Sequence, residues 1–285
     1  MESFFSFLEK RVNDVSSLLC VGLDPHISDL ESPTAASALT FCLNLVKQTA
    51  RYAAAYKPNA AFFEVFGAEG WTVLKQVVES VKEESHKQGS TIPVVLDAKR
   101  GDISSTAEAY AQSAFETLGV DGITLSPYLG KDSIDPFIKI REKGVFVLCK
   151  TSNAGSGDIQ DLIIKKEERG KNGESLSSFF FLYEHVAKLA EQWNEKNNVG
   201  IVVGATHLDA MKKIREAVPN LWFLTPGVGA QGGDLESAMK VGLRKDGKGM
   251  LIPVSRAISR ANKPAHAAAD LRDEMLSVIL NSTKK

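Results

Sequence analysis

The sequence predicts an α/β fold, a (β/α)8 TIM barrel that forms a single domain over residues 1–285. Eight short apolar runs recur along the chain, and a segment with helical periodicity follows each of them. This alternation is typical of a parallel sheet, and eight such units close the sheet into a barrel. An open doubly wound sheet is the alternative, but it usually has fewer strands, and no nucleotide fingerprint follows the first run.

The strands and helices can be placed from the apolar runs and from the spacing of apolar residues between them. We expect strands at 18–23, 53–57, 92–97, 122–125, 145–149, 199–203, 222–225 and 250–253. We expect helices at 35–51, 68–88, 103–118, 133–143, 176–196, 207–217, 233–242 and 265–280. The third helix is the clearest, because apolar residues recur on one face at Ile103, Ala107, Tyr110, Ala114 and Leu118.

Two segments fall outside this repeat. Residues 1–11 are rich in phenylalanine and predict a short N-terminal helix packed on the barrel. The stretch at about 153–175 carries the charged run 165–171 and is too long for an ordinary connection between a strand and a helix. We therefore expect an insertion there that is functional or mobile, and we expect the phenylalanines at 179–181 to belong to the core.

The composition argues against several classes of protein. Lys and Arg number 34 and Asp and Glu 35, so the net charge of −1 gives no indication of a nucleic-acid partner. No run approaches the roughly 18 apolar residues that span a membrane, and the N-terminus lacks the pattern of a signal peptide. Cys20, Cys42 and Cys149 each lie in an apolar run, which indicates buried, reduced thiols in a cytoplasmic protein. No spacing of Cys and His suggests a metal site.

The most informative stretch is Asp97-Ala98-Lys99-Arg100-Gly101-Asp102, which directly follows the third apolar run. Side chains alternate along a strand, so Asp97 and Lys99 point to the same face. Asp102 follows a glycine that lets the chain turn, which gathers acid, ammonium and acid at one strand end. Two carboxylates would raise the pKa of Lys99, and the resulting ammonium would be a proton donor or an electrostatic clamp. Taken alone, Asp102 could equally be the N-cap of the next helix.

Other polar residues also fall where strands end, and active sites in such barrels lie at the C-terminal ends of the strands. Asp24 follows the first strand, Lys57 and Asn59 the second, Ser126 the fourth and Ser152 the fifth. Singly, each has an ordinary explanation, such as a solvated lysine for Lys57 or a turn for Asp24. Their coincidence at strand ends favours a catalytic site.

The last two strand ends suggest a site for phosphate. A glycine-rich loop at 226–233 follows the seventh strand, contains Pro226 and Gln231, and offers free backbone N–H groups. Ser255 and Arg256 follow the eighth strand, and a guanidinium presents a fork of donors that suits phosphate. Loops at these two places commonly bind phosphate in barrels of this kind. A flexible connector and an arginine paired with a nearby acid are the alternatives.

Taken in order, these motifs resemble those of the orotidine 5′-phosphate decarboxylase family. The central Asp-x-Lys-x-x-Asp pattern is shared with sister barrels of other chemistry, whereas the full set is much more specific and extends over nearly the whole chain. The insertion after the fifth strand is similar to that of a longer subgroup of the family. The matching pieces are Gly22-Leu23-Asp24-Pro25, Tyr56-Lys57-Pro58-Asn59, Asp97 to Ile103 with Thr106, Ser126-Pro127-Tyr128, Lys150-Thr151-Ser152-Asn153, Thr225-Pro226-Gly227 with Gln231, and Ser255-Arg256-Ala257-Ile258.

The resemblance implies an enzyme, a carboxy-lyase that converts orotidine 5′-phosphate into UMP in de novo pyrimidine biosynthesis. It implies that no metal and no organic cofactor is needed. Among the catalytic residues, Lys99 would protonate ring carbon six as carbon dioxide leaves, and Asp97 would face the substrate carboxylate. Lys57 and Asp102 would complete the alternating network of charges.

The resemblance also implies which residues bind the substrate. Asp24 and Lys57 would hold ribose hydroxyls, Ser152 would hydrogen-bond the pyrimidine, and Gln231 and Arg256 would bind the phosphate. The other implied binding residues are Asn59, Ile103, Thr106, Ser126, Pro226 and Ser255. Since Asp102, Ile103 and Thr106 would belong to the active site of the other subunit, the resemblance implies a homodimer with shared active sites.

Two other functions stay open at this point. A metal-dependent sugar-phosphate decarboxylase of a sister barrel family shares the central motif, but it would have an acid at the end of the second strand, where this chain has Lys57. A non-catalytic nucleotide-binding barrel is the other possibility. Such a protein would have no need for Lys99 between two acids.

Overall fold

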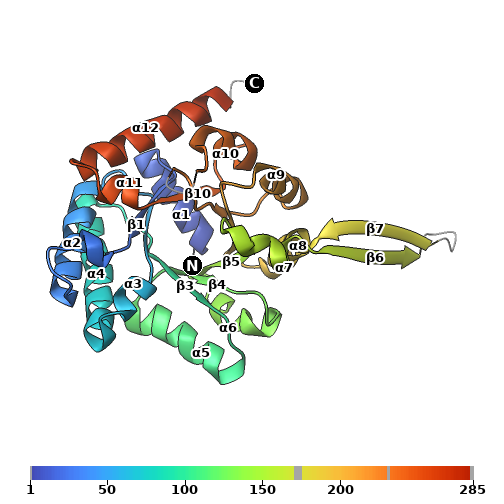
Figure 1. Cartoon of the computed structure of the whole chain (residues 1–285), viewed down its shortest axis with the longest axis horizontal. Coiled ribbons are helices and arrows are strands. Elements are labelled where there is room, and N and C mark those ends of the chain that lie inside the picture. Colours follow the sequence, from blue (N-terminus) through green and yellow to red (C-terminus); the bar gives the residue numbers. More distant parts are fainter. Residues whose placement is uncertain (1, 170–174, 230–231, 283–285) are drawn as a thin grey trace.

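Eight parallel strands form a nearly closed barrel that helices surround (Figure 1). The computed structural model describes residues 2–169, 175–229 and 232–282. The barrel strands are β1 (Leu19–Leu23), β2 (Ala55–Pro58), β3 (Val95–Arg100), β4 (Gly122–Leu125), β5 (Gly144–Lys150), β8 (Val199–Val203), β9 (Phe223–Leu224) and β10 (Met250–Val254). They are hydrogen-bonded in the order β2-β1-β10-β9-β8-β5-β4-β3. Bridges from Tyr56 to Val94 and from Asn59 to Asp97 join β2 to β3, so the two ends of the sheet meet.

The expected barrel is confirmed, and each expected strand is present with its ends shifted by no more than three residues. The largest shift is in β3, which begins at Val95 because Pro93 has no N–H to donate to a ladder. The strand continues to Arg100, past a shift in its register with β4 that lies between Leu96 and Arg100. This irregular end of β3 carries the motif that the sequence singled out.

Helices cover the outside of the barrel (Figure 1). They are α2 (Ala35–Thr49), α3 (Ala61–Glu64), α4 (Gly67–Gln88), α5 (Ser104–Gln112), α6 (Asp135–Ile138), α7 (Gly157–Gln160), α8 (Leu182–Trp193), α9 (Leu208–Ala217), α10 (Leu235–Gly242), α11 (Arg256–Ser259) and α12 (Pro264–Ser282). A π-helical turn at Ser113–Leu118 continues α5, and short 3₁₀ turns occupy Ile27–Asp29, Lys131–Ser133 and Ala154–Ser156. Within the described ranges, no helix combines the length and the apolar character needed to cross a membrane.

The helix expected at 133–143 is wrong in its length, because α6 ends at Ile138. The side-chain amide of Asn198 donates hydrogen bonds to the carbonyls of Ile138, Ile140 and Lys143 at 3.3, 3.1 and 3.0 Å. A longer helix would need such carbonyls for its own N–H groups. The chain instead passes into β5.

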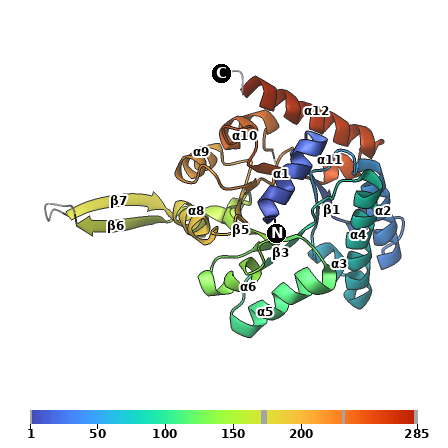
Figure 2. The ribbon, with the colours of Figure 1, turned by 180° about the vertical axis from the view of Figure 1, so that it is seen from behind.

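A β-hairpin leaves the barrel after β5 and projects to one side (Figures 1 and 2). It consists of β6 (Ile163–Arg169) and β7 (Ser175–Phe181), which pair in the antiparallel direction. The first part of the helix expected at 176–196 is therefore a strand, since aromatic residues opposite Ile163 and Ile164 favour extended pairing. Phe179 is 67% exposed, so its expected place in the core is wrong. Residues 170–174, part of the expected insertion, lie outside the described residues.

The N-terminal end of the barrel is covered by α1 (Phe4–Val15), which crosses in front of the strands in Figure 2. Phe4 packs against the first residue of β5, where a Cβ on Gly144 would lie 2.1 Å from its ring. Phe5 stacks on Trp222 with 5.7 Å between the ring centroids. The buried guanidinium of Arg11 donates to two backbone carbonyls just ahead of β2. This end of the barrel is thus filled by side chains.

All three cysteines are buried and free, as the sequence predicts. Burial raises the pKa of Cys20 to about 12, so this thiol is neutral at pH 7.

Candidate active site

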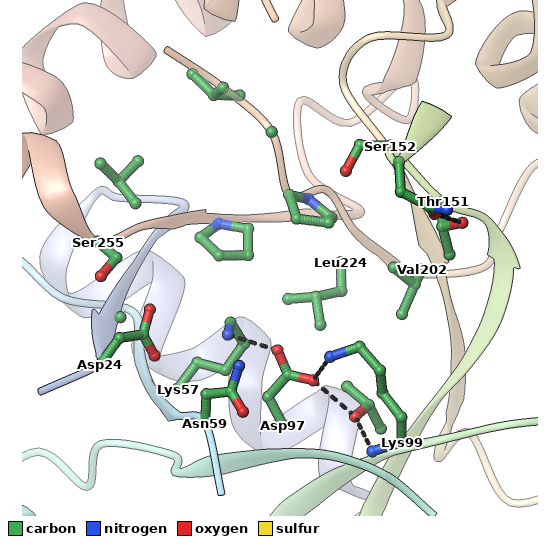
Figure 3. A pocket seen from close by; sticks show the side chains of 18 of the residues that line it. Asp24, Lys57, Asn59, Asp97, Lys99, Thr151, Ser152, Val202, Leu224 and Ser255 are labelled. Carbon is green, nitrogen blue, oxygen red and sulfur yellow. Dashed lines mark hydrogen bonds and ion pairs between the residues drawn. The ribbon is translucent and has the colours of Figure 1, made fainter. Parts of the chain in front are cut away.

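A cavity of about 590 Å³ opens where the barrel strands end (Figure 3). Small-molecule sites usually have volumes of roughly 300–1,000 Å³. The following residues that the sequence marked as site candidates line this cavity: Asp24, Lys57, Asn59, Asp97, Lys99, Ser152, Pro226, Ser255 and Arg256. Residues from both ends of the chain therefore face one open cavity of suitable size.

The other candidates do not line the cavity of this chain: Asp102, Ile103, Thr106 and Ser126. Asp102 Oδ1 accepts a hydrogen bond from Ile103 N at 2.8 Å, and no ion pair between the described side chains joins it to Lys99. The N-cap of α5 is Ile103, so the alternative that Asp102 is the N-cap is wrong. Gln231 lies outside the described residues.

The centre of the cavity holds a row of ammonium, carboxylate and ammonium groups (Figure 3). Lys57 Nζ lies 2.8 Å from Asp97 Oδ2, and Lys99 Nζ lies 2.6 Å from Asp97 Oδ1. The side chains of Lys57 and Asp97 are 8% and 13% exposed, whereas that of Lys99 is 50% exposed. The ammonium of Lys99 is therefore accessible from the cavity. Asp97, its ion-pair partner, and Lys57, which pairs with Asp97, are more buried.

The charges in this row stabilise one another. Burial would raise the pKa of Asp97, but Lys57 and Lys99 outweigh it and hold that pKa far below its usual range. Burial likewise opposes the charged form of Lys57, yet the carboxylates of Asp97 and Asp24 keep its pKa above the usual range. Both groups are therefore ionised at neutral pH. Fixed charges in so confined a place act strongly on charge that develops in a ligand.

Close packing brings β1 against the loop that follows β10. A Cβ on Gly22 would lie 2.7 Å from Ser255 Cβ and 3.2 Å from Asp24 Oδ2, so glycine is needed here. Asp24 Oδ1 and Ser255 Oγ are buried and have no hydrogen-bond partner among the described residues. Since buried polar atoms are normally hydrogen-bonded, these two are suited to a ligand with hydroxyl groups.

A buried lysine fixes the loop after β5. Lys150 is 2% exposed, and its Nζ lies 2.7 Å from Asp161 Oδ1. Thr151 N donates to Gln160 Oε1 at 2.9 Å, so the start of the loop is tied to the C-terminal end of α7. These contacts hold Thr151 and Ser152 at the cavity wall.

Several lining residues were not foreseen from the sequence. Thr124 on β4 lines the cavity and donates to Asp97 Oδ1 at 3.0 Å. Leu148, Val202 and Leu224 form an apolar part of the wall near Lys99 (Figure 3 labels the last two). The one sequence feature that could have identified these residues is their position at or near the end of a barrel strand.

The fold and the site together define a barrel enzyme that can stabilise negative charge developing in a small molecule beside Lys99. A sequence model described as Orotidine 5′-phosphate decarboxylase / HUMPS family matches residues 17–271. A curated relative from Roseiflexus castenholzii, named orotidine 5′-phosphate decarboxylase, is 45% identical over 274 residues, which are 95% of this chain and 93% of the relative. The chain belongs to the orotidine 5′-phosphate decarboxylase / HUMPS family.

Solved structures agree with this assignment. Leishmania donovani OMP decarboxylase matches with a TM-score of 0.84 and 49% identity over 98% of this chain and 99% of that chain. Leishmania donovani UMP synthase matches with a TM-score of 0.85 and 51% identity over 98% of this chain. This chain spans 57% of the length of that UMP synthase. The family resemblance drawn from the motifs is confirmed.

Proposed function

We propose that this chain decarboxylates orotidine 5′-phosphate to UMP in pyrimidine biosynthesis. The observation that carries the proposal is the row of Lys57, Asp97 and Lys99 at the cavity of a chain that belongs to this family. The curated relative that is 45% identical over nearly its whole length bears the name of this activity.

The proposed chemistry places Lys99 at the reacting carbon. The bond between ring carbon six and the carboxylate breaks, carbon dioxide leaves, and the electron pair stays on the carbon. The ammonium of Lys99 stabilises that charge and then gives the carbon its proton. Asp97 lies against the substrate carboxylate, and this contact between like charges disappears as carbon dioxide leaves.

The remaining groups are proposed to bind the nucleotide. Asp24 and Lys57 hold ribose hydroxyls, and Asp24 Oδ1, which is buried without a hydrogen-bond partner in the described part of the chain, supports this role. Ser152 hydrogen-bonds the pyrimidine, while Arg256 and Gln231 bind the phosphate. The further wall contacts that we propose for the substrate come from Asn59, Pro226 and Ser255.

We further propose a homodimer with two shared active sites. Asp102, Ile103, Thr106 and Ser126 lie outside the cavity of their own chain, and the first three would reach the site of the other subunit. Ile103 is 47% exposed, and Tyr128 and Leu129, which follow Ser126 closely in the sequence, are 83% and 46% exposed. These exposed apolar side chains suit burial against a second copy. We also propose a cytoplasmic location, because three buried free cysteines suit a reducing compartment.

The activity can be tested by following the ultraviolet absorbance of orotidine 5′-phosphate with the purified chain. We expect turnover by the parent and none by Lys99→Ala, because the proton donor is gone. Lys47→Ala, on the outer helix α2, is the matched control and should behave as the parent. Activity of Lys99→Ala within about tenfold of the parent would contradict the role of Lys99.

The sister-barrel alternative gains no support from the site. Lys57, which stands where that family would have an acid, forms an ion pair with Asp97. We expect full activity in excess EDTA. Loss of activity that magnesium restores would favour the metal-dependent sugar-phosphate decarboxylase, and a parent that binds the nucleotide without turnover would favour the non-catalytic barrel.

A further inference from the structure

Lys99 has a backbone conformation that residues with a Cβ rarely adopt. Its φ is 48°, in the left-handed region. It lies where the register between β3 and β4 shifts, between Leu96 and Arg100. Such conformations persist only where the surroundings hold them in place.

One hydroxyl group forms hydrogen bonds with this distorted segment. Thr124 Oγ1, on the neighbouring strand β4, accepts hydrogen bonds from the backbone N–H groups of Ala98 at 3.1 Å and Lys99 at 2.9 Å. The same hydroxyl donates to Asp97 Oδ1 at 3.0 Å. Its one proton and its two lone pairs are thus all used. Thr124 is 1% exposed, so water has little access to replace these bonds.

We propose that Thr124 is a positioning residue for the ammonium of Lys99, an inference that rests on the proposed function. Its hydroxyl fixes the main chain of Lys99 directly. It also fixes the carboxylate of Asp97, which lies 2.6 Å from Lys99 Nζ. The ammonium is therefore held from both ends of its own side chain, through its backbone and through its ion-pair partner.

Removing the hydroxyl would leave two backbone N–H groups without their acceptor and Asp97 without one of its donors. The segment would then relax toward ordinary strand geometry and carry the ammonium away from the reacting carbon. Small displacements of a catalytic group slow a reaction strongly. The proposed ribose and phosphate contacts come from other strands, so substrate binding should be spared.

Kinetics of variants of the full chain test the proposal. We expect Thr124→Val, which keeps the shape, to lower kcat by about 10- to 100-fold with a change in KM below about threefold. Thr124→Ser, which keeps the hydroxyl, should stay within about threefold of the parent in kcat. Thr49→Val is the matched control, because Thr49 is a fully buried threonine on α2 whose hydroxyl bonds to Leu45 O and Tyr56 Oη, and it does not line the cavity. That control should retain the kcat of the parent.

A second measurement does not depend on activity. Hydrogen exchange of the Ala98 and Lys99 amides should quicken in Thr124→Val and stay as in the parent in Thr124→Ser and Thr49→Val. This measurement decides the contacts of Thr124 even if the parent fails to decarboxylate the nucleotide. Should the valine variant not fold, Thr124→Cys takes its place with the same expectations, because a thiol is a weak donor and acceptor.

Four results would overturn the proposal. They are an unchanged kcat in Thr124→Val, equal losses in the valine and serine variants, a loss confined to KM, and unchanged exchange of both amides. A parent without activity overturns the proposed function instead, and in that case the exchange result alone settles whether Thr124 holds the Lys99 segment.

Discussion

Asp97 receives hydrogen bonds from three side chains, those of Lys57, Lys99 and Thr124. Three donors stabilise the anion so well that this carboxylate is a poor base at neutral pH. Its contribution to a reaction is therefore electrostatic, through the place and charge of Lys99 and through its own charge. Chemistry that requires a proton to be taken up at this carboxylate does not fit the site.

The ion pair of Lys57 and Asp97 predicts how stability depends on pH. The pKa of Asp97 is lowered in the folded protein, so its contribution is complete above its unfolded value of about 3.9 and is lost as the pH falls below that value. The pKa of Lys57 is raised, so its contribution is complete below about 10.4 and is lost as the pH rises further. Urea denaturation at a series of pH values should therefore show that the free energy of unfolding is highest near neutral pH and falls toward both acid and alkaline pH.

Asp97→Asn provides the comparison for this pH profile. It should lower the free energy of unfolding at neutral pH, because it removes the charge that neutralises the buried Lys57. Between neutral and acid pH, the free energy of unfolding of this variant should fall less than that of the parent. A fall as large as the parent's would mean that other carboxylates determine acid unfolding.

Arg256→Ala tests the phosphate site. A lost charge-assisted contact should lower kcat/KM on the nucleotide by a free energy of about 1.5–3 kcal/mol or more. The bare nucleoside should be affected much less, since it has no phosphate to lose. Arg260→Ala is the control, because Arg260 is paired with Asp29 at 3.1 Å and does not line the cavity. Equal losses on nucleotide and nucleoside would make Arg256 a structural residue.

Charged residues at strand ends could be recognised from the sequence, because a lysine between acids is unusual there. Thr124 could not, since a threonine inside an apolar strand looks like a core residue until its three hydrogen bonds are seen. Asp102 was expected beside Lys99, but the turn after Gly101 carries it out of the cavity of its own chain. The spacing of residues along a strand predicts the face to which their side chains point, but this rule does not extend to residues beyond a turn.

At the level of elements, apolar runs were sufficient for the barrel strands because each except β3 is buried along its whole length or nearly so, and β3 is buried at Val95 and Leu96, the end of its apolar run. The hairpin could not be predicted in this way. Its strand β6 is mostly charged, and the phenylalanines of β7 precede a helix without a turn signal. Phe181 N donates to Glu184 Oε2 at 2.7 Å, so the helix begins where a capping contact is made.

The hairpin should be dispensable for the barrel and its site. Ile163 and Phe181 face each other across its base, so the residues between them can be replaced by Asn-Gly, which suits a two-residue turn. We expect kcat/KM within about threefold of the parent and a Tm within about 4 °C, because the Lys150–Asp161 contact precedes the deleted segment. Both quantities are measured on the shortened chain.

Asp161→Ala in the full-length chain is the contrasting variant. It leaves the buried ammonium of Lys150 without its carboxylate, so it should lower the Tm clearly more than the shortened hairpin does. If shortening the hairpin instead abolishes activity while Asp161→Ala does not, the hairpin itself supports the site.

At the level of the whole molecule, the proposed shared sites can be tested by mixing two inactive variants, Lys99→Ala and Asp102→Ala. A mixed dimer has one site with both changes and one with neither. After complete exchange of equal amounts, half of the dimers are mixed, so activity should return to about a quarter of the parent's. Lys99→Ala mixed with Asp97→Ala is the control and should stay inactive, since both residues serve the same site. Demonstrated exchange without recovery would place Asp102 in its own chain's site.

The helix α1, which covers the N-terminal end of the barrel, is synthesised on the ribosome before most of the residues that it packs against. Phe5 comes out early, but Trp222, on which it stacks, is made about 10–40 s later at the usual rates of synthesis. During that interval the apolar face of α1, with Phe4, Phe5 and Leu8, has no finished barrel to cover. This helix is therefore made before the strands that it covers and can dock only after they have formed, and until then it is a segment that chaperones would recognise.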